Sequence, residues 1–196
     1  MANESLESKV DLSDVFKEFN GRKFDVIYAD PPWAFNSKKT GGSMKSGASH
    51  KYDVMSINDL KSLPVDAISS DNCLLVMWWV GAMPQEAIDL VGSWGFKLKS
   101  MNGFVWNKLT VNYLPFFGMG YYTRAGSESA IIAVKGKPDI KSRSVRAVIS
   151  AKVGAHSEKP DAFRKAIIEL MGEECAKVEL FARRLSDGFE SWGNEV

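Results

Sequence analysis

The chain has 196 residues, of which 45% are hydrophobic and 25% are charged, and its formal net charge is +1. This length fits one globular domain with a sizeable core, whereas two full domains would be cramped. The near-neutral charge excludes a strongly basic nucleic-acid coat protein, although it is compatible with a local basic patch.

In chain order, a polar lead-in of residues 1–22 comes first, and its opening residues resemble neither a signal peptide nor a membrane span. Short apolar runs rich in β-branched and aromatic residues predict buried strands at Phe24–Ala29 and at 73–80. We predict further strands at 103–107, 130–135, 147–150 and 177–182, and one more near the end.

Two helices are predicted between these strands. The clearer one begins at Pro160 and ends at Gly172, and its apolar residues share one helical face: Phe163, Ala166, Ile167, Leu170 and Met171. The other runs from Pro84 to about Trp94. Alternating strands and helices predict an α/β sheet covered by helices on both faces.

Two stretches do not follow this pattern. Residues 36–53 are rich in Lys, Gly and Ser, and we interpret them as a mobile loop. Residues 135–152 hold six basic residues against the single acid Asp139, which predicts a basic patch. The two cysteines, Cys73 and Cys175, give neither a metal-ligand spacing nor a disulfide framework, so we expect a reduced, cytoplasmic protein.

The motif Asp30-Pro31-Pro32-Trp33 follows the first predicted strand. Ligands of open α/β sheets bind beyond the carboxyl ends of the strands, so this position indicates a site. The prolines lack N–H donors, and we expect their carbonyls to face the crevice as acceptors. Asp30 adds a carboxylate, and Trp33 adds a flat face that stacks a base with about 1–3 kcal/mol. The motif therefore suits an adenine edge; the alternative is a rigid turn without chemistry.

Such acceptors would make an aromatic amine a better nucleophile. The free amine is a poor one, because its lone pair is delocalised into the ring. Hydrogen bonds from the amine to Asp30 and to the Pro31 carbonyl favour a tetrahedral nitrogen that attacks a sulfonium methyl group in line. Catalysis would come from orientation and from stabilisation of the developing positive charge, without a covalent intermediate or a metal.

At this point the chain resembles the DPPW-type N(6)-adenine methyltransferases, which include the catalytic subunit of the eukaryotic messenger-RNA adenosine methyltransferase and many bacterial and phage enzymes. The landmarks recur in family order: ADPPW at 29–33, Tyr52, MWWV at 77–80, Trp106-Asn107-Lys108, AVKGKP at 133–138, HSEKPD at 156–161, VELFAR at 178–183 and WGNE at 192–195. The resemblance spans about residues 24–196 and, together with the length, leads us to expect a single methyltransferase domain over residues 1–196. Its fold would be Rossmann-like and use S-adenosylmethionine, with a permuted order in which the catalytic DPPW precedes the main cofactor motif.

The resemblance also implies roles on the substrate side. Asp30, Pro31, Pro32 and Trp33 would form the catalytic pocket for the target amine. Tyr52 would contact the flipped adenine. Independently of the resemblance, we expect the lysines of the loop 36–53 to neutralise phosphates: Lys38, Lys39, Lys45 and Lys51.

On the cofactor side, Asp30 would lie near the amino-acid part of S-adenosylmethionine, and Lys159 would bind its carboxylate at a helix start. Three residues would surround the ribose and adenine: Arg183, Asn194 and Glu195. This chain departs from the eukaryotic enzymes at Leu185-Ser186, where they place a His-Asn pair for the ribose. His156 is as consistent with a structural role as with a ligand contact.

We expect DNA as the substrate, because the chain is a short version of the fold that resembles bacterial and phage members more than the long eukaryotic enzymes. RNA is the alternative substrate. The alternative function is a catalytically inactive nucleic-acid-binding partner subunit, which the intact DPPW motif disfavours. The sequence leaves open whether the protein acts alone, as a homodimer or with a partner subunit, and it predicts no association with a membrane.

Overall fold

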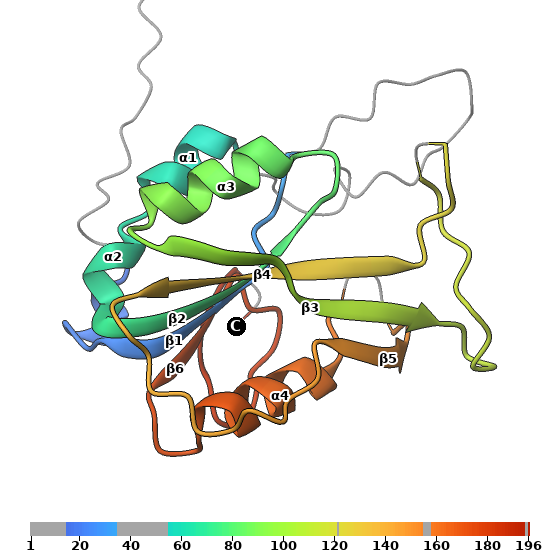
Figure 1. Cartoon of the computed structure of the whole chain (residues 1–196). Coiled ribbons are helices and arrows are strands. Elements are labelled where there is room, and N and C mark those ends of the chain that lie inside the picture. Colours follow the sequence, from blue (N-terminus) through green and yellow to red (C-terminus); the bar gives the residue numbers. More distant parts are fainter. Residues whose placement is uncertain (1–14, 35–54, 121, 155–157, 195) are drawn as a thin grey trace, which may run out of the picture.

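The computed structural model describes residues 15–34, 55–120, 122–154, 158–194 and 196. Their core is one seven-stranded sheet in the order β5-β3-β4-β2-β1-β6-β7 (Figure 1). In chain order its strands are β1 (Phe24–Ala29), β2 (Ser69–Trp79), β3 (Lys97–Leu109), β4 (Ser127–Lys135), β5 (Val148–Lys152), β6 (Lys177–Leu180) and β7 (Glu190–Trp192). Every predicted strand is therefore present, although β2, β3 and β4 are longer than predicted.

The strand directions determine which residues meet at each edge of the sheet. β1 pairs in parallel with both β2 and β6, β3 pairs in parallel with β5, and β6 pairs in parallel with β7. β4 runs antiparallel to its two neighbours, β2 and β3. The start of β4 consequently lies at the edge where the other six strands end, which we call the carboxyl edge.

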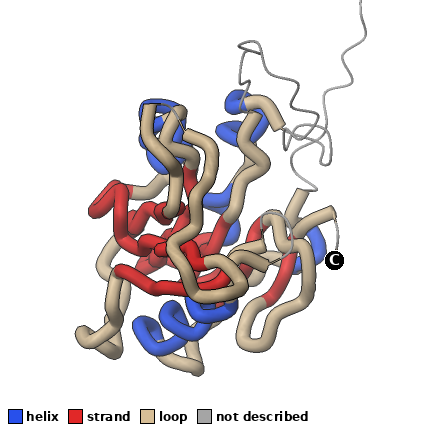
Figure 2. Tube along the Cα trace, turned by 90° about the vertical axis from the view of Figure 1, so that its right-hand side faces the viewer, coloured by secondary structure: helices blue, strands red, loops and turns tan. Residues whose placement is uncertain are grey.

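Helices cover both faces of the sheet, as predicted. One face carries α1 (Ile57–Ser62), α2 (Val65–Ile68), α3 (Pro84–Ser93) and the short 3₁₀ helix η2 (Lys17–Phe19), and the other carries α4 (Asp161–Met171) (Figures 1 and 2). Alternation along β1 separates the two cores: Ile27 packs towards α1 and α3, whereas Val26 and Tyr28 pack towards α4. The α/β class is thus confirmed.

Both predicted helices are present within two residues of the expected bounds. The sequence prediction missed α1, which is only six residues long. Its start carries a capping box, in which the Ser56 hydroxyl accepts from the Asp59 N–H and the Asp59 carboxylate accepts from the Ser56 N–H. Within the described ranges, no helix has the length and apolar character needed to span a membrane.

Candidate active site

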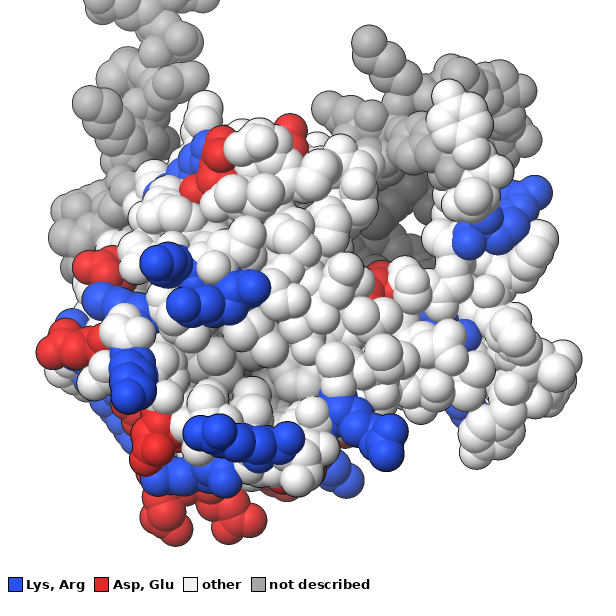
Figure 3. Space-filling model, viewed as in Figure 1, with Lys and Arg blue, Asp and Glu red and all other residues white. Residues whose placement is uncertain are grey.

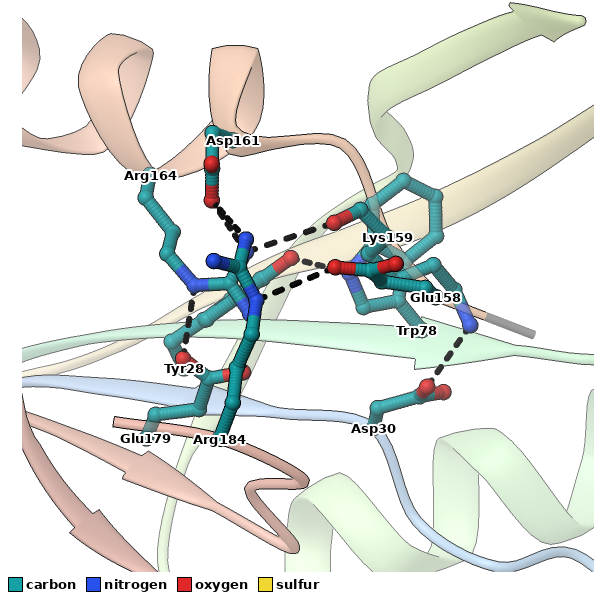
Figure 4. Close-up of polar contacts among 9 residues, drawn as sticks. All are labelled: Tyr28, Asp30, Trp78, Glu158, Lys159, Asp161, Arg164, Glu179 and Arg184. Carbon is teal, nitrogen blue, oxygen red and sulfur yellow. Dashed lines mark hydrogen bonds and ion pairs between the residues drawn. The ribbon is translucent and has the colours of Figure 1, made fainter. Parts of the chain in front are cut away.

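The site is built around an ion pair between segments that lie 129 residues apart in the chain. Asp30 directly follows β1, and Lys159 precedes α4 by two residues. Lys159 Nζ donates to Asp30 Oδ2 at 2.7 Å (Figure 4). The lysine is only 8% exposed, and the Asp30 side chain is 24% exposed. The buried ammonium therefore fixes one carboxylate oxygen at the carboxyl edge of the sheet.

A second carboxylate and a second lysine extend this pair. Glu128 is the second residue of β4, and the antiparallel direction of β4 brings it to the carboxyl edge. Its Oε2 lies 3.4 Å from Lys159 Nζ, and its Oε1 lies 2.5 Å from the Nζ of Lys108, near the end of β3. The result is a chain of alternating charges, Asp30–Lys159–Glu128–Lys108, which we call the charge quartet. Neither Glu128 nor Lys108 had a predicted role.

Each inner member of the quartet stabilises the charge of the other. Burial disfavours the charged form of Lys159, but the adjacent carboxylates of Asp30 and Glu128 outweigh it and raise the lysine pKa above its ordinary value. Burial also acts against the charged form of Glu128, but Lys159 and Lys108 outweigh it and lower the pKa of the carboxyl. At both inner groups the neighbours of opposite charge thus outweigh burial and favour the charged form.

The proline carbonyls differ from the sequence-based expectation, which treated both as pure acceptors facing the crevice. Pro31 O accepts from the Trp33 N–H at 2.8 Å, and Pro32 O accepts from the Met55 N–H at 3.2 Å. The motif thereby connects to the segment that precedes α1. Since a carbonyl oxygen has two lone pairs, each still has one for a further donor.

Trp33 is half-buried and packs against the core under α1 and α3, and its indole N–H donates to Trp78 O at 3.1 Å. Trp78 lies on the opposite face of the sheet, where it is almost fully buried, as predicted for a core residue. Its indole N–H donates to the Tyr28 hydroxyl at 2.8 Å, and its ring lies 5.3 Å from Lys159 Nζ. Trp78 therefore stabilises the buried ammonium of Lys159 by a cation–π interaction.

A buried network anchors the start of α4 to β6 (Figure 4). The guanidinium of Arg164 makes two hydrogen bonds to Glu179, Nε to Oε2 at 2.7 Å and Nη2 to Oε1 at 2.6 Å. Its Nη1 donates to Asp161 Oδ1 at 3.0 Å and to the Lys159 carbonyl at 3.3 Å. Nearer the surface, Arg184 pairs with Glu158 and Asp161. Residues on both sides of Lys159 are thus held by arginines.

The remaining predicted cofactor residues follow neighbouring strands. Arg183, half-buried, comes three residues after β6, and Asn194, exposed, comes two residues after β7. Because β1, β6 and β7 are adjacent and parallel, Asp30, Arg183 and Asn194 share one edge of the sheet. The remaining residues singled out from the sequence lie outside the described residues: Lys38, Lys39, Lys45, Lys51, Tyr52, His156 and Glu195.

The predicted basic stretch, residues 135–152, is divided by the fold. Lys135 ends β4 and pairs with Asp66 at 2.6 Å, at the edge opposite Asp30. Lys152 ends β5 and lies at the carboxyl edge. Lys141 pairs with Asp139. The two ends of the stretch therefore lie at opposite edges of the sheet, because β4 and β5 end at opposite edges.

Comparisons with known proteins find matches along nearly the whole chain. The model of the MT-A70 family matches residues 24–195, which include Asp30 and Lys159. Over 201 residues, 94% of this chain and 83% of the relative, the chain is 35% identical to the type II methyltransferase M.MunI of Mycoplasma sp. It is 28% identical over 204 residues to the human N(6)-adenine-specific methyltransferase METTL4. It is also 29% identical over 179 residues to the Drosophila melanogaster N(6)-adenosine-methyltransferase MT-A70-like protein.

The extent of these matches differs between the relatives. The matches cover 95% and 89% of this chain for the human and fly proteins, but only 40% and 27% of the relatives themselves. The chain thus spans most of the Mycoplasma protein and less than half of each animal protein.

Proposed function

Because this chain belongs to the MT-A70 family and is an N(6)-adenine methyltransferase, we propose that it takes a methyl group from S-adenosylmethionine and transfers it to the exocyclic amine of adenine in DNA. The contact between Asp30 and Lys159 carries the proposal, because it joins the candidate catalytic motif to the candidate cofactor segment at 2.7 Å. The 35% identity to the type II methyltransferase M.MunI supports DNA as the substrate.

The charge quartet fits the amino-acid part of S-adenosylmethionine. That part carries an ammonium and a carboxylate, and the sulfonium adds a further positive charge. Lys159 offers a cation for the carboxylate, while Asp30 and Glu128 offer anions beside it for the positive groups. Arg183 and Asn194 follow β6 and β7 and would serve the ribose and adenine of the cofactor.

S-adenosylmethionine supplies an electrophilic methyl group when bound. Asp30 would use its two oxygens differently: Oδ2 accepts from Lys159, and Oδ1, which receives no hydrogen bond from the described residues, would accept from the adenine amine. The free lone pairs of the Pro31 and Pro32 carbonyls would accept a second N–H from that amine. These acceptors orient the nitrogen lone pair and stabilise the positive charge that develops during transfer.

Adenine in a duplex must leave the base stack to reach such acceptors, as in other enzymes that act on bases. The half-buried ring of Trp33 would then stack on the flipped base. We therefore expect unpaired or mismatched adenine to react faster than paired adenine.

The test is a methylation assay with S-adenosylmethionine and matched DNA oligonucleotides, RNA oligonucleotides and free adenosine, scored as methyladenine by mass spectrometry. Asp30→Ala and Asp30→Asn should lower turnover by roughly 10²-fold or more. Asp71→Ala is the matched control. Asp71 is exposed near the start of β2, and because β1 and β2 are parallel it lies at the edge of the sheet opposite Asp30. Near-normal turnover of Asp30→Ala would refute the assigned chemistry, and a clear preference for RNA would refute DNA alone.

A further inference from the structure

The connection between β3 and β4, residues 110–126, exposes an unusual amount of apolar surface. We call its described part the hairpin tip. Six large side chains in it are between 62% and 108% exposed: Val111, Tyr113, Leu114, Phe117, Met119 and Tyr122. A cluster of exposed apolar side chains of this kind is typical of a surface that binds a ligand or a macromolecule.

Backbone hydrogen bonds hold the hairpin tip in place. Thr110 N donates to Leu114 O at 2.8 Å, and Gly118 N donates to Ala125 O at 2.9 Å. Gly118 packs so closely that an added Cβ would lie 2.4 Å from Ala125 O. The exposed rings are therefore displayed on a folded hairpin.

Two of the exposed tyrosines have a backbone conformation that favours glycine. Tyr113 and Tyr122 have φ values of 62° and 59°, in the left-handed region that glycine adopts most readily. Bulky side chains at such positions strain the backbone, and both rings are largely exposed, so core packing does not explain them. We therefore infer that Tyr113 and Tyr122 serve to expose their rings to a ligand.

Cations accompany the rings. Lys152 Nζ lies 3.8 Å from the centre of the Tyr113 ring, and the Arg124 guanidinium lies 5.0 Å from that of Phe117. Residues 110–126 contain no Asp or Glu. In Figure 3, white and blue side chains dominate the described surface at the end where β3 and β5 finish, with some red beside the grey atoms, whereas most red side chains gather at the opposite end.

We propose that the hairpin tip binds unpaired nucleotides that flank the target adenine, with bases stacked on Tyr113, Phe117 and Tyr122. Lys152 and Arg124 would contact the phosphates, which favours a nucleic-acid strand over a protein partner. The proposal rests on the proposed function and deepens it. The tip is continuous with the site, since Lys108 and Glu128 of the charge quartet lie on the two strands that it joins.

Three variants test the proposal: Tyr113→Gly, Tyr122→Gly and Phe117→Ala. The glycine variants relieve the left-handed backbone, so their melting temperatures should be unchanged or higher. The control is Ile88→Ala, since Ile88 is exposed on α3, away from the tip. Fluorescence anisotropy would give the Kd for a single-stranded oligonucleotide of about 20 nucleotides with one adenine, and for a trimer with that adenine.

Each ring variant should raise the Kd for the long oligonucleotide about tenfold and leave the Kd for the trimer unchanged. Kd values equal to those of Ile88→Ala would overturn the proposal. So would a dimer, seen by analytical ultracentrifugation, that the variants dissociate without changing the Kd, since the tip would then join two copies. If the wild-type protein methylates nothing, the proposed function fails, and the anisotropy still decides whether the tip binds the strand.

Discussion

Arg164 offers a sharp test of how the fold supports the site. Both Arg164 and Glu179 are more than nine-tenths buried, and they share two hydrogen bonds of 2.6 and 2.7 Å. Arg164→Met would leave the Glu179 carboxylate buried without its partner. Breaking a buried pair in this way costs about 3–5 kcal/mol, a large part of the roughly 5–15 kcal/mol by which such domains are stable. Urea unfolding should show this loss.

The double variant Arg164→Met/Glu179→Met separates stability from function. It removes both charges, so most of the lost free energy of unfolding should return. The hydrogen bond from Arg164 to the Lys159 carbonyl, 3.3 Å long, would still be missing. The Kd for S-adenosylmethionine should therefore stay about two- to tenfold higher in both variants. A single variant as stable as the wild type would refute the energetic argument, and a normal Kd in the double variant would refute the positioning of Lys159.

Two further outcomes follow from single side chains. Lys159→Met should raise the Kd for S-adenosylmethionine about tenfold or more in calorimetry, because a charge-assisted hydrogen bond contributes about 1.5–3 kcal/mol. An unchanged Kd would show that Lys159 does not bind the cofactor. Burial raises the pKa of the Cys73 thiol to about 12. Iodoacetamide at pH 8 should therefore alkylate the partly exposed Cys175 and leave Cys73 unmodified until the protein unfolds. Equally fast modification of both thiols in the native protein would contradict this prediction.

Much of the fold could be predicted from local patterns. The strands are marked by short apolar runs, α4 by a periodic apolar face and α3 by a proline at its start, so their positions were predicted closely. The six-residue helix α1 is too short for a periodic signal, although Ser56 and Asp59 marked its start. The direction of β4 has no local signature, because an apolar strand looks the same whichever way it runs. That direction is why the basic stretch is divided.

The site was predictable only in part, for the same reason. Asp30 and Lys159 were both selected from the sequence, each for its role towards ligands, and their direct contact emerges only from the fold. Glu128 gave no signal, because a lone glutamate at the start of a strand is usually a solvated side chain. The cofactor roles of Arg183 and Asn194 stay predictions.

The central position of β1 in the sheet bears on the way in which the chain folds during synthesis. β1 is among the first described elements, yet one of its two neighbours is β6, about 150 residues later. Until β6 leaves the ribosome, the edge of β1 that carries Asp30 N–H has no partner strand, and an unpaired edge of apolar residues is prone to aggregate. Such distant pairing also slows folding, because a long loop must close before the contacts form. Glu179 of β6 also holds Arg164, which donates to the Lys159 carbonyl, so the site reaches its final form only after β6 joins the sheet. Nascent chains that lack β6 should therefore depend on chaperones.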